Sequence, residues 1–156
     1  AQVPLDLSAL LDAVAHDARF EAEAREVVVD TSIEPGLGLR GHAELLRSVF
    51  DNVLRNAIRH SPATGIVALT AQRDGPRDQL VVSIADQGPG VPDAMLDAMF
   101  DAFVRVDAAR SADTGGHGLG LAIARQGVKA HGGSIVARNR PAGGLEVEVR
   151  FSAGRT

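Results

Sequence analysis

The clearest hydrophobic pattern lies in the middle of the chain and predicts one amphipathic helix from Gly41 or His42 to His60. At about 100° per residue, its apolar positions share one side, which we expect to face a core. Asn52, Asn56 and Arg59 follow i, i+4, i+7 spacing and therefore lie together on the opposite side. The apolar stripe consists of Leu46, Phe50, Val53, Leu54 and Ala57.

The other patterns along the chain predict helices alternating with pairs of strands. An amphipathic stretch predicts a helix over 7–25, capped by Asp6, and a later one predicts a helix ending near Ala130. Residues 92–103 indicate a short helix. The predicted strands are 26–30 with 37–40 as a short partner, 65–73 with a central 79–85, and 134–139 with 145–151. This order is typical of a two-layer α/β sandwich, in which a mixed, mostly antiparallel sheet packs against about three helices.

Composition limits the kind of protein. The 156 residues, 45% of them hydrophobic, suit a single domain with a sizeable core. The net charge of -4, without a basic run, argues against nucleic-acid binding. The absence of cysteine excludes disulfides, thiolate zinc sites and a cysteine nucleophile. No apolar run in the sequence is long enough to span a membrane, and the start at Ala1 leads us to expect a domain excised from a longer protein.

The two asparagines of the central helix are its least expected residues. Asparagine is a poor helix former, because its side chain competes for backbone hydrogen bonds. A carboxamide oxygen can coordinate Mg²⁺ and its NH₂ can donate to a phosphate, while Arg59 can offset phosphate charge. The alternative is a solvated polar face, and from this helix alone the solvated face is the simpler interpretation.

A second candidate site follows the predicted central strand, in the stretch from Asp86 through Gly88 and Gly90 to Pro92. Glycine lets a backbone pass close to a flat ligand. The Asp86 carboxylate can accept a hydrogen bond from the exocyclic amine of adenine, and it would repel the oxygen that guanine carries there. The alternative is an ordinary tight turn.

A polar, non-periodic segment over 104–114 precedes a glycine-rich stretch, 115–120, that leads into a helix. Such a segment is typical of a mobile loop. Its Arg105 and Arg110 could fold onto phosphates or remain ordinary surface arginines. Free N–H groups at a helix N-terminus attract phosphate. The stretch is not a P-loop, since it lacks Gly-Lys-Ser/Thr, and it is a poor Rossmann fingerprint, since no strand precedes it.

Four motifs, in this order and spacing, resemble the catalytic ATP-binding domain of bacterial sensor histidine kinases, in the superfamily of gyrase, Hsp90 and MutL. Asn52-Val-Leu-Arg-Asn56-Ala-Ile-Arg-His60 is similar to the N box and Asp86-Gln-Gly-Pro-Gly90 to the first glycine box. Phe100-Asp-Ala-Phe103-Val-Arg105 is similar to the F box, and Gly116-His-Gly118-Leu-Gly120-Leu to the second glycine box. The resemblance covers essentially the whole chain and implies a single Bergerat-type domain over 1–156 with a flexible ATP lid over about 104–117.

The resemblance also implies roles for individual residues, with ATP and Mg²⁺ as cofactors. Asn56 would ligate Mg²⁺, Asn52 would contact a phosphate or the metal, and Asp86 would accept from the adenine amine. His60 stands where many members place a tyrosine beside the adenine. Asn52, Arg59 and Arg105 would be the catalytic residues, the two arginines meeting phosphates. The implied nucleotide-binding residues are Asn52, Asn56, Arg59, His60, Asp86, Gly88, Gly90, Arg105, Arg110, Gly116, His117, Gly118, Leu119 and Gly120.

One position distinguishes kinases from hydrolases in this superfamily. The related ATPases carry a glutamate four residues before the metal-binding asparagine, as the general base for water. Here that position is Asn52, which cannot take a proton, and Asp51 lies about 100° around the helix. We therefore expect little ATP hydrolysis.

The resemblance implies an ATP-dependent protein-histidine kinase whose phosphoacceptor histidine lies on a separate dimerisation domain, absent from this chain together with any sensor domain. The isolated domain would be monomeric and would bind Mg-ATP without autophosphorylating. The implied partners are that dimerisation domain, in a homodimeric parent, and the receiver domain of a response regulator. The implied location is cytoplasmic, within a parent that can be anchored in the inner membrane. Two alternatives stay open: an ATPase of the same superfamily, and a module that acts only by protein contact.

Overall fold

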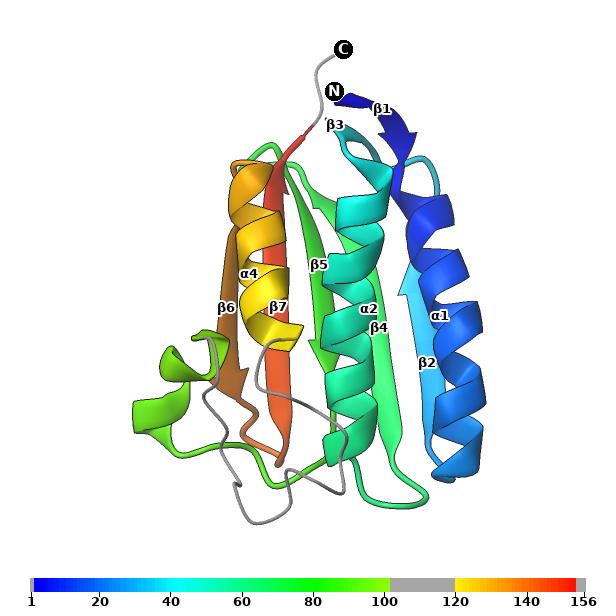
Figure 1. Cartoon of the computed structure of the whole chain (residues 1–156), viewed down its shortest axis with the longest axis vertical. Helices are drawn as coiled ribbons and strands as arrows, with labels where there is room; N and C mark the ends of the chain where they lie inside the picture. Colours follow the sequence, from blue (N-terminus) through cyan, green and yellow to red (C-terminus); the bar gives the residue numbers. More distant parts are fainter. Residues whose placement is uncertain (1, 102–119, 154–156) are drawn as a thin grey trace.

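The fold is a sheet of five strands that is covered on one face by helices (Figure 1). The computed structural model describes residues 2–101 and 120–153. The helices within these ranges are α1 (Leu7–Ala24), α2 (Ala43–His60) and α4 (Gly120–Ala130). The strands, in spatial order, are β2 (Val28–Ile33), β4 (Ile66–Asp74), β5 (Gln79–Ala85), β7 (Leu145–Ser152) and β6 (Ser134–Asn139).

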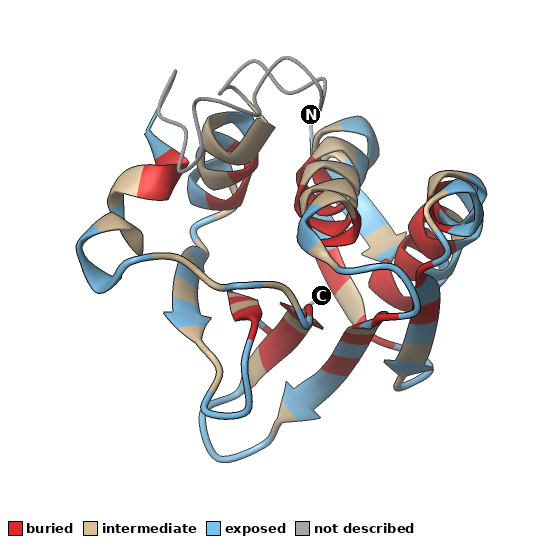
Figure 2. Ribbon diagram, turned by 90° about the horizontal axis from the view of Figure 1, so that it is seen from below, coloured by how far each residue is buried: buried red, intermediate tan, exposed pale blue. Residues whose placement is uncertain are grey.

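The sheet confirms the predicted two-layer α/β sandwich. β2 runs parallel to β4, and the other neighbouring pairs in the sheet are antiparallel. β5 is the middle strand, as its apolar run predicted, and Leu80, Val82 and Ile84 are buried beneath the helices. Buried residues concentrate between the helix layer and the sheet (Figure 2). The other face of the sheet carries no helix among the described residues.

α2 lies in the middle of the helix layer, between α1 and α4 (Figure 1). Its predicted apolar stripe is buried, and Phe50 meets Phe151 of β7 edge to face at 6.3 Å between ring centroids. α4 packs closely on α2 because Gly127 has no side chain: a Cβ there would collide with Val49. The helix that carries both asparagines is therefore fixed on three sides by core contacts.

The first strands differ from the prediction. β3 (Gly38–Gly41) does not pair with β2; it forms a separate two-stranded sheet with β1 (Val3–Asp6), which sequence analysis missed. β1 is a mostly exposed, proline-containing strand of four residues with little hydrophobic signal. β2 begins later than expected because Glu26 adopts a left-handed backbone and the Val27 amide still donates to Ala22 at the end of α1.

The predicted short helix over 92–103 is not an α-helix where the structure describes it. Two 3₁₀ turns, Asp93–Met95 and Ala98–Phe100, take its place. The Met95 amide donates to Pro92 and the Phe100 amide to Asp97, three residues back in each case. Met99 and Phe100 are buried, so the segment is anchored by its end rather than by a helical stripe. In the part of the chain that the structure describes, no helix combines the length and apolarity needed to cross a membrane.

Candidate nucleotide site

The residues predicted to form the site come from segments that meet at one end of the sandwich. In Figure 1, α2 and β5 run downward to their ends and α4 begins at its lower end, while β1 begins and β7 ends at the top. Direct contacts join these segments. A Cβ at Gly88 would collide with the backbone oxygen of His60, and one at Gly120 would lie 3.0 Å from Asn52 Oδ1.

Asp86 is the buried charge of this region, with 2% of its surface exposed. Its Oδ1 accepts hydrogen bonds from the backbone N–H groups of Gly88 (2.9 Å) and Leu145 (3.1 Å). Its own N–H donates to the Leu145 carbonyl (2.9 Å), and its carbonyl accepts from Arg140 Nη1 (2.6 Å). Among the described residues, both bonds to the carboxylate use Oδ1, so Oδ2 is left for another donor.

The glycines after Asp86 are required by contacts within the protein. Gly88 abuts the His60 carbonyl, and a side chain at Gly90, where φ is +71°, would collide with Asn139 Oδ1. The prediction gave a different reason, close approach of a flat ligand. The structure shows that these glycines let the loop pack against α2 and β6.

Asn52 presents its oxygen toward α4. Its Nδ2 donates to the Ser48 carbonyl at 2.8 Å and lies 3.3 Å from Ser48 Oγ, which fixes the orientation of the amide. Oδ1 then lies beside Gly120, the first residue of α4. Of the two predicted roles, this orientation favours a metal ligand over a phosphate donor.

Asn56 and His60 lie one turn apart at the end of α2. Asn56 is half-buried, and its carbonyl accepts from His60 Nδ1 at 2.8 Å, so that ring nitrogen carries the proton. The exposed His60 ring is thereby folded back along its own helix, while the His60 backbone touches the Gly88 turn. A series of contacts thus leads from Asp86, at the end of β5, through Gly88 to His60, and from His60 to Asn56 within α2.

Arg59 is directed toward α1. Its Nε lies 3.3 Å from Glu21 Oε1, and Arg55 Nη1 lies 3.5 Å from the other oxygen of that carboxylate. Asp51 also points this way, pairing with Arg55 at 2.7 Å. The structure therefore does not bring Arg59 to the Asp86 end of the site. A phosphate contact by Arg59 stays a prediction, and it requires the pair with Glu21 to open.

The remaining predicted site residues lie outside the described residues. They are Arg105, Arg110, Gly116, His117, Gly118 and Leu119, together with the lid over 104–117 and Phe103 of the F box. Of the second glycine box, the structure describes only Gly120 and the residue after it.

Sequence analysis missed the contribution of the last hairpin. Asn139, Arg140 and Leu145 all hold the loop that begins at Asp86, and Gly144, with φ +100°, lies against the Asp86 carbonyl. The signal available in the sequence was the pair Gly143-Gly144, between the predicted strands 134–139 and 145–151. Nothing local linked it to a loop more than 50 positions earlier.

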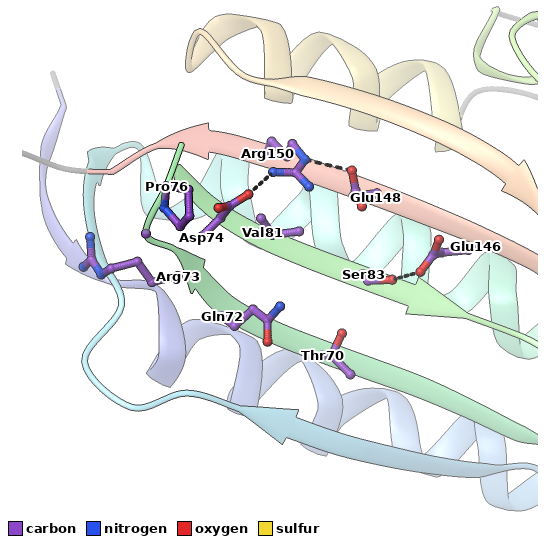
Figure 3. A pocket seen from close by; sticks show the side chains of 11 residues that line it. Thr70, Gln72, Arg73, Asp74, Pro76, Val81, Ser83, Glu146, Glu148 and Arg150 are labelled. Atoms are coloured by element: carbon purple, nitrogen blue, oxygen red, sulfur yellow. Dashed lines mark hydrogen bonds and ion pairs between the residues drawn. The ribbon is translucent and has the colours of Figure 1, made fainter. Parts of the chain in front are cut away.

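The opposite face of the sheet carries a separate open hollow of about 510 Å³, formed by β4, β5 and β7 (Figure 3). Four of its polar and charged side chains are paired with one another or with neighbouring strands: Asp74, Glu146, Glu148 and Arg150. Arg150 Nη1 lies 2.9 Å from Asp74 and its Nε 2.8 Å from Glu148, and the Ser83 hydroxyl donates to Glu146 at 2.7 Å. None of the predicted nucleotide-binding residues lines this hollow.

The residues at the α2 end fit a magnesium nucleotide. The Oδ2 atom of a buried carboxylate suits an amine donor, and two half-buried amides offer neutral oxygens. The described residues contain no group of three or more histidine, cysteine or acidic side chains that could hold a metal unaided. Mg²⁺ bound here would therefore depend on phosphate oxygens in addition to protein ligands.

The fold is an α/β sandwich of the Bergerat type, as predicted. The chain belongs to the family described as histidine kinase-, DNA gyrase B-, and HSP90-like ATPase, whose model matches residues 41–155. The resemblance seen in the four motifs is thereby confirmed.

Individual relatives are sensor histidine kinases. The chain is 33% identical, over 99% of its length, to the signal transduction histidine-protein kinase BaeS of Escherichia coli (strain K12), of which it covers 32%. Among solved structures, the mycobacterial sensor histidine kinase MprB matches with a TM-score of 0.86 at 27% identity, both chains being fully covered. Full-length ShkA in complex with AMPPNP matches with a TM-score of 0.83 at 28% identity, over all of this chain and 32% of that one. The chain thus spans about a third of the length of its full-length relatives.

Proposed function

We propose that this chain is the catalytic domain of a sensor histidine kinase, which binds Mg-ATP and presents its terminal phosphoryl group to a histidine on a separate dimerisation domain. The observation that carries the proposal is the buried Asp86, whose Oδ1 is held by two backbone donors. Family membership supports ATP as the nucleotide.

Asp86 would select the base. With Oδ1 occupied by the Gly88 and Leu145 amides, Oδ2 would accept from the exocyclic amine of adenine. Guanine carries an acceptor oxygen at the corresponding position, and a carboxylate repels it. The close approach of Gly88 to the His60 carbonyl would keep the Asp86 carboxylate at a fixed distance from the end of α2.

Asn56 and Asn52 would hold Mg²⁺ through their amide oxygens. The hydrogen bonds from Asn52 Nδ2 to Ser48 already direct its oxygen away from its own helix. When bound, Mg-ATP would supply a phosphoryl group whose charge the metal partly neutralises. These residues would bind and orient the nucleotide, so they would contribute electrostatic positioning rather than proton transfer.

The absence of a base at Asn52 favours a kinase over a hydrolase. An amide cannot deprotonate water, and the neighbouring Asp51 is paired with Arg55 at 2.7 Å on the α1 side. The nucleophile would instead be an imidazole supplied by the dimerisation domain of a longer, cytoplasmic, homodimeric parent. A response regulator would receive the phosphoryl group from that histidine.

A direct test has two parts. Calorimetric titration of the chain with a non-hydrolysable ATP analogue and MgCl₂ should give one binding site, and GTP should bind far more weakly. Adding a purified dimerisation domain that carries the phosphoacceptor histidine should then yield acid-labile phosphohistidine from radiolabelled ATP. Absence of binding would overturn the proposal, and steady phosphate release without phosphohistidine would identify an ATPase instead.

A further inference from the structure

We propose that Asn139 and Arg140, at the end of β6, are positioning residues that hold the Asp86–Val91 loop in the geometry needed to bind adenine. This inference rests on the proposed nucleotide-binding function and assigns a role to a hairpin outside the four family motifs. Neither side chain needs to touch the nucleotide, because each acts through the backbone of the loop.

Asn139 pairs with both backbone groups of one loop residue. Its Oδ1 accepts from the Val91 N–H at 2.9 Å, and its Nδ2 donates to the Val91 carbonyl at 2.7 Å. Nδ2 also donates to Asp93 Oδ1 at 3.1 Å. A single amide thus replaces the strand partner that the loop lacks at this point, and it fixes the far end of the Asp86 loop to the sheet.

Arg140 holds the end of the loop that begins at Asp86. Its Nη1 donates to the Asp86 carbonyl at 2.6 Å, a charge-assisted bond to the residue whose carboxylate would read the base. The hairpin approaches closely enough for this bond because Gly144 has no side chain and adopts φ +100°. The Leu145 backbone completes the attachment: its N–H donates to the carboxylate oxygen Oδ1 of Asp86, and its carbonyl accepts from the Asp86 N–H.

Together these contacts fix both ends of the loop to one hairpin. Gly88 lies between the two attachments and carries the amide that holds Oδ1 in place. Without the attachments, the loop would exchange among conformations, of which only a fraction would place Oδ2 for the adenine amine. Apparent affinity falls in proportion to the competent fraction, so the loss should appear in binding even when the chain stays folded.

The test compares Asn139→Ala and Arg140→Ala with Arg138→Ala. Arg138 is a matched control from the same strand end: it makes ion pairs with Glu146 and Glu148 but, among the described residues, no hydrogen bond or ion pair with the loop. Affinities for AMP and ATP are measured by calorimetry on the 156-residue chain, well below each melting temperature. Amide hydrogen exchange at Gly88 is followed by NMR in the absence of nucleotide.

We expect Asn139→Ala and Arg140→Ala each to raise the Kd roughly tenfold, the size expected for losing one to three partly buried or exposed hydrogen bonds. The fold increase in Kd should be the same for AMP and ATP, because the weakened contact is with the adenine base, which both nucleotides share. Exchange at Gly88 should become faster, Arg140→Lys should recover part of the affinity, and Arg138→Ala should match the wild type in every readout.

The outcomes separate this inference from the proposed function. If the wild type bound no adenine nucleotide, both would fail. If the wild type bound but Asn139→Ala and Arg140→Ala kept its Kd and its exchange rate at Gly88, only the positioning role would be overturned. A lower melting temperature with unchanged Kd in both variants would likewise identify a merely structural hairpin.

Discussion

The Asp86 end of β5 and the open face of the sheet use carboxylates in opposite ways. Asp86, at the α2 end, is 2% exposed and is held by neutral backbone donors, with no ion pair to its carboxylate among the described residues. On the open face of the sheet, Glu148 and Asp74 both pair with Arg150, and Glu146 pairs with Arg138. Both regions are polar, but within residues 2–101 and 120–153 the Asp86 carboxylate has no ion pair, whereas those of the open face do.

The pKa values of the open face reflect this pairing. The Ser83 hydroxyl, followed by Arg138, holds the pKa of Glu146 below its ordinary value. Burial alone would raise the pKa of Glu148, but hydrogen bonds from Arg150 and Arg138 outweigh it and lower that pKa. The bonds to Glu148 and Asp74 raise the pKa of Arg150.

This difference shows why a hollow is not by itself a binding site. The open face has volume, but its carboxylates at Asp74, Glu146 and Glu148 already pair with arginines, so a cation that bound them would have to break ion pairs. The Asp86 region offers a fixed carboxylate and half-buried amides, and a ligand that donates to Asp86 Oδ2 would break no ion pair among the described residues. The satisfied region should therefore affect stability, and the unsatisfied region should affect binding.

The largest expected effect on binding is that of Asp86→Asn. The variant keeps the size of the side chain but replaces the charged acceptor, and we expect adenine nucleotide binding to weaken by about 1.5–3 kcal/mol, or roughly 10- to 150-fold. Calorimetry with ATP measures it, and Glu148→Gln on the open face is the control that should leave the Kd unchanged. An equal loss in both variants would remove the distinction between the two regions.

Asn56→Ala tests the metal end of the site. Titrations with ATP in MgCl₂ and in EDTA should differ for the wild type, and the ratio of the two affinities should fall to about one in the variant, because an amide ligand to Mg²⁺ is lost. Asn56→Asp should retain a metal dependence. A variant that responds to magnesium as the wild type does would refute the assigned role of Asn56.

Arg150→Ala should change stability and leave binding unchanged. Its loss releases Asp74 and Glu148, and we expect a melting temperature lower by no more than about 4 °C at neutral pH. Because folding lowers the pKa of these carboxyls, their pairing stabilises the protein above the unfolded pKa and is lost as the pH falls through the lower folded value. The difference between variant and wild type in thermal scans should therefore shrink below the ordinary glutamate pKa of 4.5. A gap that stayed constant into acid would show that the ion pairs contribute nothing.

The smallest expected effect belongs to Glu21→Gln. Removing the charge that holds Arg59 should free this arginine for phosphate, and ATP affinity should rise by about 1.5- to 5-fold, the contribution of one half-buried, solvent-accessible ion pair. Adenosine, which has no phosphate, should bind as before, and Asp51→Asn, which affects Arg55 alone, is the matched control. An unchanged ATP affinity would mean that Arg59 serves only to attach α2 to α1.

Much of the fold and part of the site could be predicted from local pattern. The amphipathic period of α2, the capping of α1 by Asp6 and the apolar run of β5 each reside within one segment, so the sequence determines them directly. The same holds for Asp86, a carboxylate at the end of a buried strand, and for the amides of Asn52 and Asn56 on one side of a helix.

Other features depend on which segments meet, and only the tertiary structure decided them. The pairing of β1 with β3, the contact of Arg59 with Glu21, and the attachment of the Asp86 loop to the last hairpin join residues 32 to 59 positions apart in the chain. No local periodicity encodes such contacts, because they form when apolar faces pack and bring distant polar groups within hydrogen-bonding distance. The sequence specified which groups were available for chemistry, and packing chose the partner of each.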